Sequence, residues 1–123
     1  MSRLELTFRF GDHKTSPNRT DMERALTEVF RESVLGLPEE DLTEHPSSWL
    51  TLGRDVEDRW STLSLYIYRG GLAILTKFAD QDDGDAEYEH CRNALDEAGA
   101  LLLWELLARG AESELLARFA DDL

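Results

Sequence analysis

The chain has 123 residues, 41% of them hydrophobic, which suits one folded domain with a real core and is too little for two. Its 26 acidic residues outnumber its 13 Lys and Arg, and a formal net charge of −13 disfavours direct binding to the phosphates of nucleic acids. The sequence shows no signal peptide and no apolar run that could span a bilayer, and its one cysteine, Cys91, fits a reducing compartment. We therefore expect a single domain over residues 1–123, located in the cytoplasm and without membrane contact.

The N-terminal part of the chain predicts a strand followed by a helix. Residues 4–10 alternate between apolar and polar side chains, as a half-buried strand does. Thr20 and Glu23 have the spacing of a capping box, so we predict that the helix begins there. Gly36 should end it near Leu35. The apolar stripe of this helix comprises Met22, Leu26, Val29, Phe30 and Ser33.

The middle of the chain predicts three strands. An acidic connector (38–48) precedes a short strand (49–52) and a charged turn (53–59), and a hairpin follows over residues 60–78. A two-residue turn at Gly70-Gly71 would join the hairpin strands, since glycine readily adopts the positive φ angles of tight turns. In that register one side of the hairpin carries Leu63, Leu65, Ile67, Ile74 and Phe78, and the other side carries Ser64, Tyr66, Tyr68, Ala73, Leu75 and Lys77.

The C-terminal part predicts two helices. The acidic run 80–85 supplies a helix start, because acids near a helix N-terminus complement its dipole, and we expect the helix itself over residues 86–108. Its apolar side broadens at residues 101–104, which indicates a part that is deeply buried or covered on a second side. A short helix around residues 115–119 follows. The buried side of the long helix is predicted to comprise Tyr88, Cys91, Leu95, Ala98, Leu102 and Leu106.

These elements predict an α+β fold in the order β-α-β-β-β-α-α. Four strands and two main helices favour a single, mainly antiparallel four-stranded sheet with the helices packed on one face. The sheet side that bears Leu63, Leu65 and Ile67 should meet the helices. The strand order stays open, because the N-terminal strand can pair at either edge.

The sequence contains no motif that indicates catalysis, a cofactor or a metal site. Glu87 and His90 have the Glu-x-x-His spacing of di-iron proteins, but such sites need two copies and further carboxylates. The run 80–85 resembles a calcium-binding loop, although its glycine and the residue expected to be a bidentate glutamate do not fit. Gly70-Gly71 lacks the following helix of a phosphate-binding loop. We therefore predict a protein that is not an enzyme and binds neither cofactor nor metal.

The hairpin side that faces away from the helices predicts a partner-binding surface. A contiguous exposed patch of aromatic residues is typical of protein interfaces, and the acidic stretches that flank the hairpin in sequence would steer a basic partner towards it. The predicted contact residues are Trp60, Tyr66, Tyr68, Leu75, Asp55, Glu57, Asp58, Asp80, Asp82 and Asp83. The alternative is that a loop or the acidic connector covers the aromatic side.

In size, acidity, mixed α/β layout and lack of catalytic groups, the chain resembles the immunity proteins (antitoxins) of bacterial toxin systems. The resemblance is one of charge and layout over the whole chain, without a shared motif. It implies a cytoplasmic, non-catalytic inhibitor that plugs the active cleft of a cognate basic toxin. A nuclease is one such toxin, because its basic groove binds phosphates.

Two other functions are compatible with the sequence. An acidic secretion chaperone would dimerise and bind an unfolded effector segment, with residues 101–104 as the dimer helix or the wrapping groove. The sequence leaves the choice between monomer and homodimer open. A small-molecule enzyme or ligand-binding domain would need polar groups that converge in a pocket, and the predicted core offers only Ser33, Thr76 and Cys91.

Overall fold

The computed structural model describes residues 2–31, 46–56, 59–79 and 86–120. Within these ranges, strands and helices follow the alternation and periodicity of the sequence, with some differences in extent that are given below. In chain order the elements are β1 (Ser2–Thr7), β2 (His13–Thr15), α1 (Arg19–Phe30), β3 (Ser47–Val56), β4 (Arg59–Tyr68), β5 (Ala73–Phe78), β6 (Tyr88–Arg92), α3 (Glu97–Ala108) and α4 (Glu112–Ala120).

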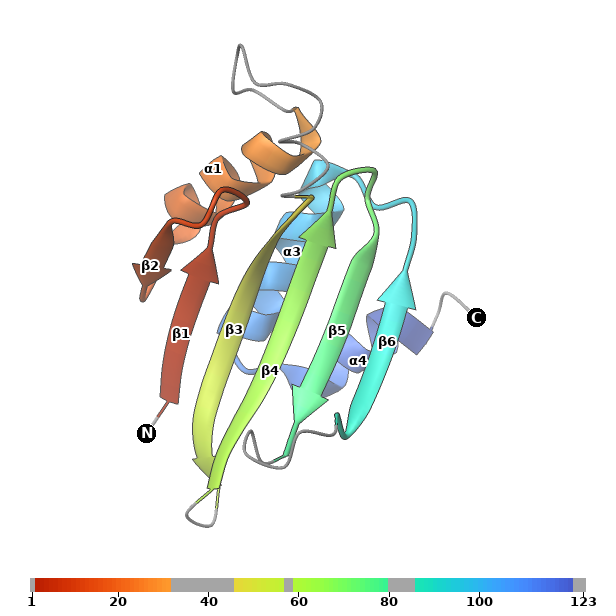
Figure 1. The fold of residues 1–123 in the computed structure, drawn as a ribbon. Helices are drawn as coiled ribbons and strands as arrows, with labels where there is room; N and C mark the ends of the chain where they lie inside the picture. The colour runs from red at the N-terminus through yellow and green to blue at the C-terminus, as the bar shows by residue number, and fades with distance from the viewer. Residues whose placement is uncertain (1, 32–45, 57–58, 80–85, 121–123) are drawn as a thin grey trace.

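The described strands form one antiparallel sheet in the order β2-β1-β3-β4-β5-β6. Figure 1 shows α1, α3 and α4 on the same side of this sheet. The predicted α+β class, with one antiparallel sheet and the helices on one face, is therefore confirmed. The sheet has six strands in the described ranges and not four, because β2 and β6 were not predicted as strands. The N-terminal strand β1 pairs with β3.

The core lies between the sheet and the helices. In β3 and β4 the leucines alternate with polar and aromatic residues, and the pairs Leu50↔Leu65 and Leu52↔Leu63 point towards the helices. Trp104 on α3 is fully buried, and its indole N–H donates a hydrogen bond to the Leu65 carbonyl at 3.1 Å. Full burial of each such apolar side chain stabilises the fold by about 1.5–3 kcal/mol relative to exposure. The predicted core positions Leu63, Leu65 and Ile67 are confirmed.

Helix α1 starts slightly earlier than predicted. Its capping box is formed by Asn18 and Asp21: the Asn18 side chain accepts from the Asp21 N–H, and the Asp21 carboxylate accepts from the Asn18 N–H. The predicted pair, Thr20 and Glu23, is therefore wrong by two residues. The helix ends at Phe30, and the predicted end near Leu35 lies outside the described residues. Of the predicted stripe, Met22, Leu26 and Val29 are buried, Phe30 is half-buried, and Ser33 lies outside the described residues.

Strand β3 is longer than predicted and replaces most of the charged turn. It runs from Ser47 to Val56 and pairs along its whole length with β4, down to Val56 opposite Arg59. Gly53 and Arg54 are therefore strand residues, and Gly53 lies opposite Thr62. Pairing with two neighbours, β1 and β4, outweighs the low strand propensity of the charged residues in this segment.

The turn between β4 and β5 has three residues and not the predicted two. The Tyr68 N–H donates to the Leu72 carbonyl at 2.8 Å, which leaves Arg69, Gly70 and Gly71 in the loop. Both glycines have positive φ angles, 87° and 88°. Gly71 is also held from outside, because its carbonyl accepts from the Leu95 N–H at 3.0 Å.

The longer turn shifts β5 by one residue relative to the predicted register. Leu65 lies opposite Leu75, and Tyr66 lies opposite Ile74. A shift of one residue moves every side chain of a strand to the other face of the sheet. The predicted sides of β5 are therefore reversed: Ala73, Leu75 and Lys77 face the helices, whereas Ile74, Thr76 and Phe78 face away from them.

The segment predicted as the first half of the long helix is strand β6. Tyr88–Arg92 pairs with β5, with Cys91 opposite Ile74, and Ala94 has a positive φ of 61°, which a helix does not accommodate. Helix α3 starts at Glu97, and its cap is Asp96, whose side chain accepts from the Gly99 N–H at 2.7 Å. The predicted start at residues 80–85 lies outside the described residues. Of the predicted buried side, Leu106 is buried, Tyr88 and Leu95 are half-buried, and Cys91, Ala98 and Leu102 are exposed.

Neighbouring residues in β5 test the observed register directly. Leu75→Ala should lower the free energy of unfolding by about 2–5 kcal/mol, because Leu75 is 0% exposed in the core. Ile74→Ala should cost less than half as much, because Ile74 is half-buried on the other side of the sheet. Urea denaturation of both variants measures the difference. A larger loss for Ile74→Ala would restore the register that a two-residue turn predicts.

Candidate protein-binding face

The sheet has one side that no described helix covers, which we call the open face (Figure 1). The strand pairing places the predicted contact residues Trp60, Tyr66 and Tyr68 on it, and Asp55, which lies opposite Trp60, shares this side. Leu75 is not on the open face, because the register shift puts it in the core. The other predicted contact residues, Glu57, Asp58, Asp80, Asp82 and Asp83, lie outside the described residues.

Three rings form a stacked row along the open face. Trp49 on β3 lies opposite Tyr66 on β4, and their ring centroids are 5.2 Å apart with an interplanar angle of 30°. Tyr68 continues the row, with its centroid 6.4 Å from that of Tyr66. Burial, and to a smaller extent the neighbouring Tyr68, raise the pKa of Tyr66 above its ordinary value. The neutral form of the Tyr66 phenol is therefore favoured. We call Trp49, Tyr66 and Tyr68 the aromatic row.

Small hydroxyl side chains form the floor between the rings. Thr62, Ser64 and Thr76 on the open face are only 6%, 9% and 7% exposed, although no helix lies over them in the described residues. Thr51 and Ser64 share a hydrogen bond of 2.9 Å across β3 and β4. The rings of Trp49, Tyr66 and Phe78 line the same groove as Thr62 and Ser64, so the open face has a polar floor and aromatic walls.

The open face has two adjoining grooves, which lie where small hydroxyl side chains stand beside large aromatic ones. The larger, of about 470 Å³, is flanked by the aromatic rings of Trp49, Tyr66 and Phe78, and His13 lies at its margin. The smaller has a volume of about 180 Å³. The two share Glu5, Thr51 and Thr62 in their linings, so they form one continuous hollow across β1, β3 and β4. A hollow with aromatic walls and a polar floor is suited to side chains of a protein partner.

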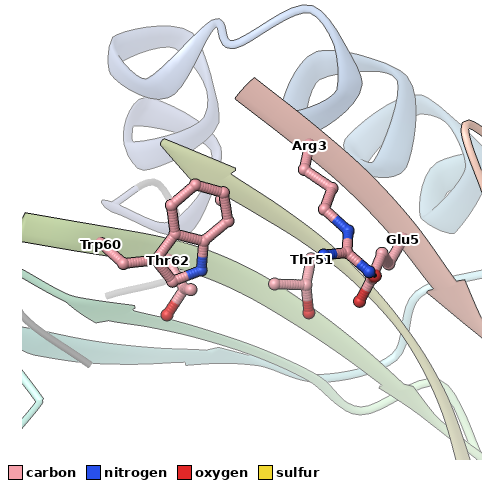
Figure 2. Close-up of a pocket in the computed structure, with 6 residues that line it drawn as sticks. Arg3, Glu5, Thr51, Trp60 and Thr62 are labelled. Atoms are coloured by element: carbon pink, nitrogen blue, oxygen red, sulfur yellow. The ribbon is translucent and has the colours of Figure 1, made fainter. Parts of the chain in front are cut away.

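The smaller groove, which we call the Trp60 groove, has an indole on one side and an ion pair on the other. Figure 2 shows Trp60 and Thr62 on β4, Thr51 on β3, and the Arg3–Glu5 pair on β1. The indole lies over Gly53: a Cβ atom at that position would clash with Trp60 Cζ2. Only glycine at position 53 therefore allows this position of the ring.

The charge near the open face is acidic where the structure describes it. Asp55 and Glu89 are exposed on this face, and Glu89 accepts from the Thr76 hydroxyl at 3.5 Å. Glu5 is half-buried and paired with Arg3. The face therefore combines aromatic area with acidic groups, in a chain whose formal net charge is −13.

The most connected polar cluster lies on the helix side and is structural. The Glu112 carboxylate on α4 accepts from Lys77 Nζ and from the Tyr88 hydroxyl, each at 2.9 Å. Burial acts to raise the pKa of Glu112, but the hydrogen bonds from Lys77 and Tyr88 outweigh it and hold the pKa below its ordinary value. Burial, followed by the bond to Glu112, raises the pKa of Tyr88. The cluster ties β5 and β6 to α4.

No group of three or more His, Cys, Asp or Glu side chains that could hold a metal ion occurs among the described residues. The Glu87 and His90 pair lies on or beside the edge strand β6, where both side chains are exposed. Cys91 is an exposed thiol on the same strand. None of the described helices has the length and apolarity needed to cross a membrane.

The broad apolar arc at residues 101–104 mostly belongs to the core. Leu103 and Trp104 are 2% and 0% exposed, and Leu101 is half-buried. Leu102 is the one large hydrophobic residue that is exposed in the described ranges, with 39% of its surface accessible. The second-side cover that the sequence predicts is provided by α1 and the sheet of the same molecule.

Several residues of the open face were not predicted from the sequence. Trp49 was assigned to a short strand without a side, and Arg3, Glu5 and Gly53 were not assigned to any site. The alternation of side chains along a strand would have indicated these residues. In β3 the odd-numbered residues from Trp49 to Gly53 alternate with Leu50 and Leu52, and in β1 Arg3 and Glu5 alternate with Leu4 and Leu6. Ile74 and Phe78 were missed because of the turn length.

The contact between Gly53 and Trp60 can be tested by a double-mutant cycle. Gly53→Ala should destabilise the protein by about 1–3 kcal/mol, because the added methyl group displaces the indole. In a Trp60→Ala background the same substitution should cost almost nothing, since the space above position 53 is then free. Urea denaturation of the four proteins gives the coupling. Equal costs in both backgrounds would show that the ring does not lie over Gly53.

Comparison with known proteins does not assign the chain to a family. No protein-family model matches it, and neither a curated protein nor a solved structure is significantly similar to it. The function proposed below is therefore inferred from the open face, its aromatic row and its charge.

Proposed function

We propose that this protein is a non-catalytic binding protein that neutralises a basic protein partner, and that it acts as an immunity protein against a cognate bacterial toxin in the cytoplasm. The observation that supports this proposal is the open face: the rings of Trp49, Tyr66 and Tyr68 stack in a row on a sheet side that no described helix covers. These rings are half-buried, so part of each ring remains accessible to a partner, and aromatic rings provide large contact areas.

The open face has aromatic side chains near its centre and acidic side chains around them, as protein interfaces commonly do. Aromatic anchors near the centre of an interface supply most of its affinity, and polar groups around them supply orientation and specificity. Here the aromatic row lies on the central strands β3 and β4, and the exposed acids Asp55 and Glu89 lie towards the end of a strand and on the edge strand β6. This arrangement favours a partner with a basic surface.

The net charge supports a partner that normally binds phosphates. A chain with a formal charge of −13 attracts a basic surface over a long range and raises the rate of encounter at low ionic strength. A toxin that cleaves nucleic acid has such a surface around its active cleft. An acidic, aromatic face that occupies this cleft would exclude the substrate without any chemistry of its own.

The two alternatives have less support. A secretion chaperone that dimerises through residues 101–104 would need that arc at the surface, and Leu103 and Trp104 are in the core of the chain itself. A small-molecule enzyme would need reactive groups that converge on a pocket, and the acidic and basic side chains that line the grooves are Arg3, Glu5 and His13, of which Arg3 and Glu5 pair with each other.

Co-expression tests the proposed function. The proposal expects a neighbouring gene to encode a toxic domain that stops the growth of a host cell, and co-expression of this chain should restore growth. The Tyr66→Ala/Tyr68→Ala variant should lose this protection and bind the purified domain at least about tenfold more weakly, since truncation of an aromatic hot-spot residue costs about 2 kcal/mol or more. Calorimetry measures the binding, and denaturation shows whether the variant remains folded.

Leu102→Ala is the matched control, because Leu102 is an exposed apolar residue on α3, on the helix side of the sheet. It should protect cells as well as the unmodified chain. Failure of the unmodified chain to protect contradicts the immunity function, and equal loss of protection in the Leu102 variant and the tyrosine variant contradicts docking on the open face.

A further inference from the structure

We infer that the Trp60 groove is a subsite for an arginine side chain of the partner, and that Arg3 occupies the acidic end of this subsite in the free protein. The inference rests on the proposed function and names the chemical group that the open face selects. It follows from the two walls of the groove, its floor, and the exposure of the Arg3–Glu5 pair.

The walls of the groove match the two binding modes of a guanidinium group. The Trp60 indole on β4 offers an aromatic surface, and arginine stacks on tryptophan more often than lysine does. The Glu5 carboxylate on β1 offers two oxygen atoms, which fit the forked donors of arginine. Strand β3 lies between these walls, and Glu5 lies level with Ser64, four residues along β4 from Trp60, whose ring reaches back over Gly53.

The floor of the groove is low and can accept hydrogen bonds. Gly53 has no side chain, and Thr51 and Thr62 are small and carry hydroxyls. The groove has a volume of about 180 Å³. This is enough for the planar end of an arginine and the methylene groups next to it. Asp55, the exposed neighbour of Trp60 across the strand pair, adds a second negative charge near the indole.

The Arg3–Glu5 pair places a guanidinium group against the Glu5 carboxylate, and the exposure of the pair favours displacement of Arg3. Arg3 contacts the Glu5 carboxylate, and the two side chains are 60% and 39% exposed. Exposed ion pairs are weak, because water solvates both charges and screens their attraction. Arg3 also lies beyond the pairing of β1 with β2, which covers only Glu5 to Thr7. A partner's arginine that also stacks on Trp60 therefore gains a contact that Arg3 does not make to this ring in the described structure.

A titration with N-acetyl-arginine amide tests the subsite without the natural partner. In ¹⁵N-labelled protein, the indole N–H signal of Trp60, assigned with a Trp60→Phe variant, should shift and saturate at millimolar concentrations of the probe. N-acetyl-citrulline amide, which has the same shape without the charge, should give no saturable shift. Equal responses to the two probes would overturn the inference.

Two variants separate the roles of the paired side chains. Arg3→Gln should tighten binding of the arginine probe about two- to fivefold, because it removes a competing guanidinium whose exposed ion pair is worth about that factor. Glu5→Gln should weaken binding by a similar factor. Glu114→Gln, which removes one charge from an exposed position on α4, is the matched control and should leave binding unchanged. Unchanged or weaker binding by Arg3→Gln contradicts the displacement of Arg3.

Failure of the arginine subsite and failure of the proposed immunity function give different experimental results. If the arginine probe does not bind, while the Tyr66→Ala/Tyr68→Ala variant still loses protection against the toxin, the subsite is wrong and docking on the open face stands. If the probe binds as expected and the chain gives no protection, the groove takes a guanidinium group but the immunity function is wrong.

Discussion

The antiparallel pairing of β3 with β4 positions both the core and the candidate binding face. One register places Leu50 and Leu52 beside Leu65 and Leu63 under the helices, and on the other side it places Trp49 beside Tyr66. Because side chains alternate along a strand, the aromatic row cannot move to the helix side without exposing the leucines. The stability of the core therefore fixes the position of the rings, and the rings need no further interaction to stay at the surface.

Because the described helices form a single layer on one side of the sheet, none of them covers the aromatic side. The helices α1, α3 and α4 occupy one side of the sheet, and their apolar faces are used in packing against it and against each other. Burial of aromatic residues is favourable, so a sheet side that carries three stacked rings, a second tryptophan and a phenylalanine gains further free energy when a partner covers it. The acidic net charge then limits which partner does so. Under the proposed function, shape and charge together favour a basic protein over a second copy of the same acidic chain.

The sequence predicts the sides of β4 correctly because its alternation is unambiguous: Leu63, Leu65 and Ile67 are core, and Tyr66 and Tyr68 are outside. It fails for β5, since Gly70-Gly71 fits a two-residue turn equally well and the bond from Leu95 to Gly71, which holds the longer loop, joins distant parts of the chain. It also fails at Tyr88–Arg92, where pairing with β5 outweighs a helical pattern that continues into α3. Local patterns thus predict the side on which a residue lies within one strand, and long-range backbone contacts decide the relation between strands. The Trp60 groove was missed for the second reason, because its residues come from three strands.

The accessibility of the aromatic row in the free protein is the central claim, and hydroxyl-radical footprinting measures it most directly. Trp49, Tyr66 and Tyr68 are half-buried on the open face and should be oxidised faster than Trp104, which is 0% exposed beneath the sheet and serves as the internal reference. Addition of the toxic domain should then protect Tyr66 and Tyr68 without changing Trp104. Protection of both tyrosines to the level of Trp104 in the free protein would show that another part of the chain covers them, and would contradict the account.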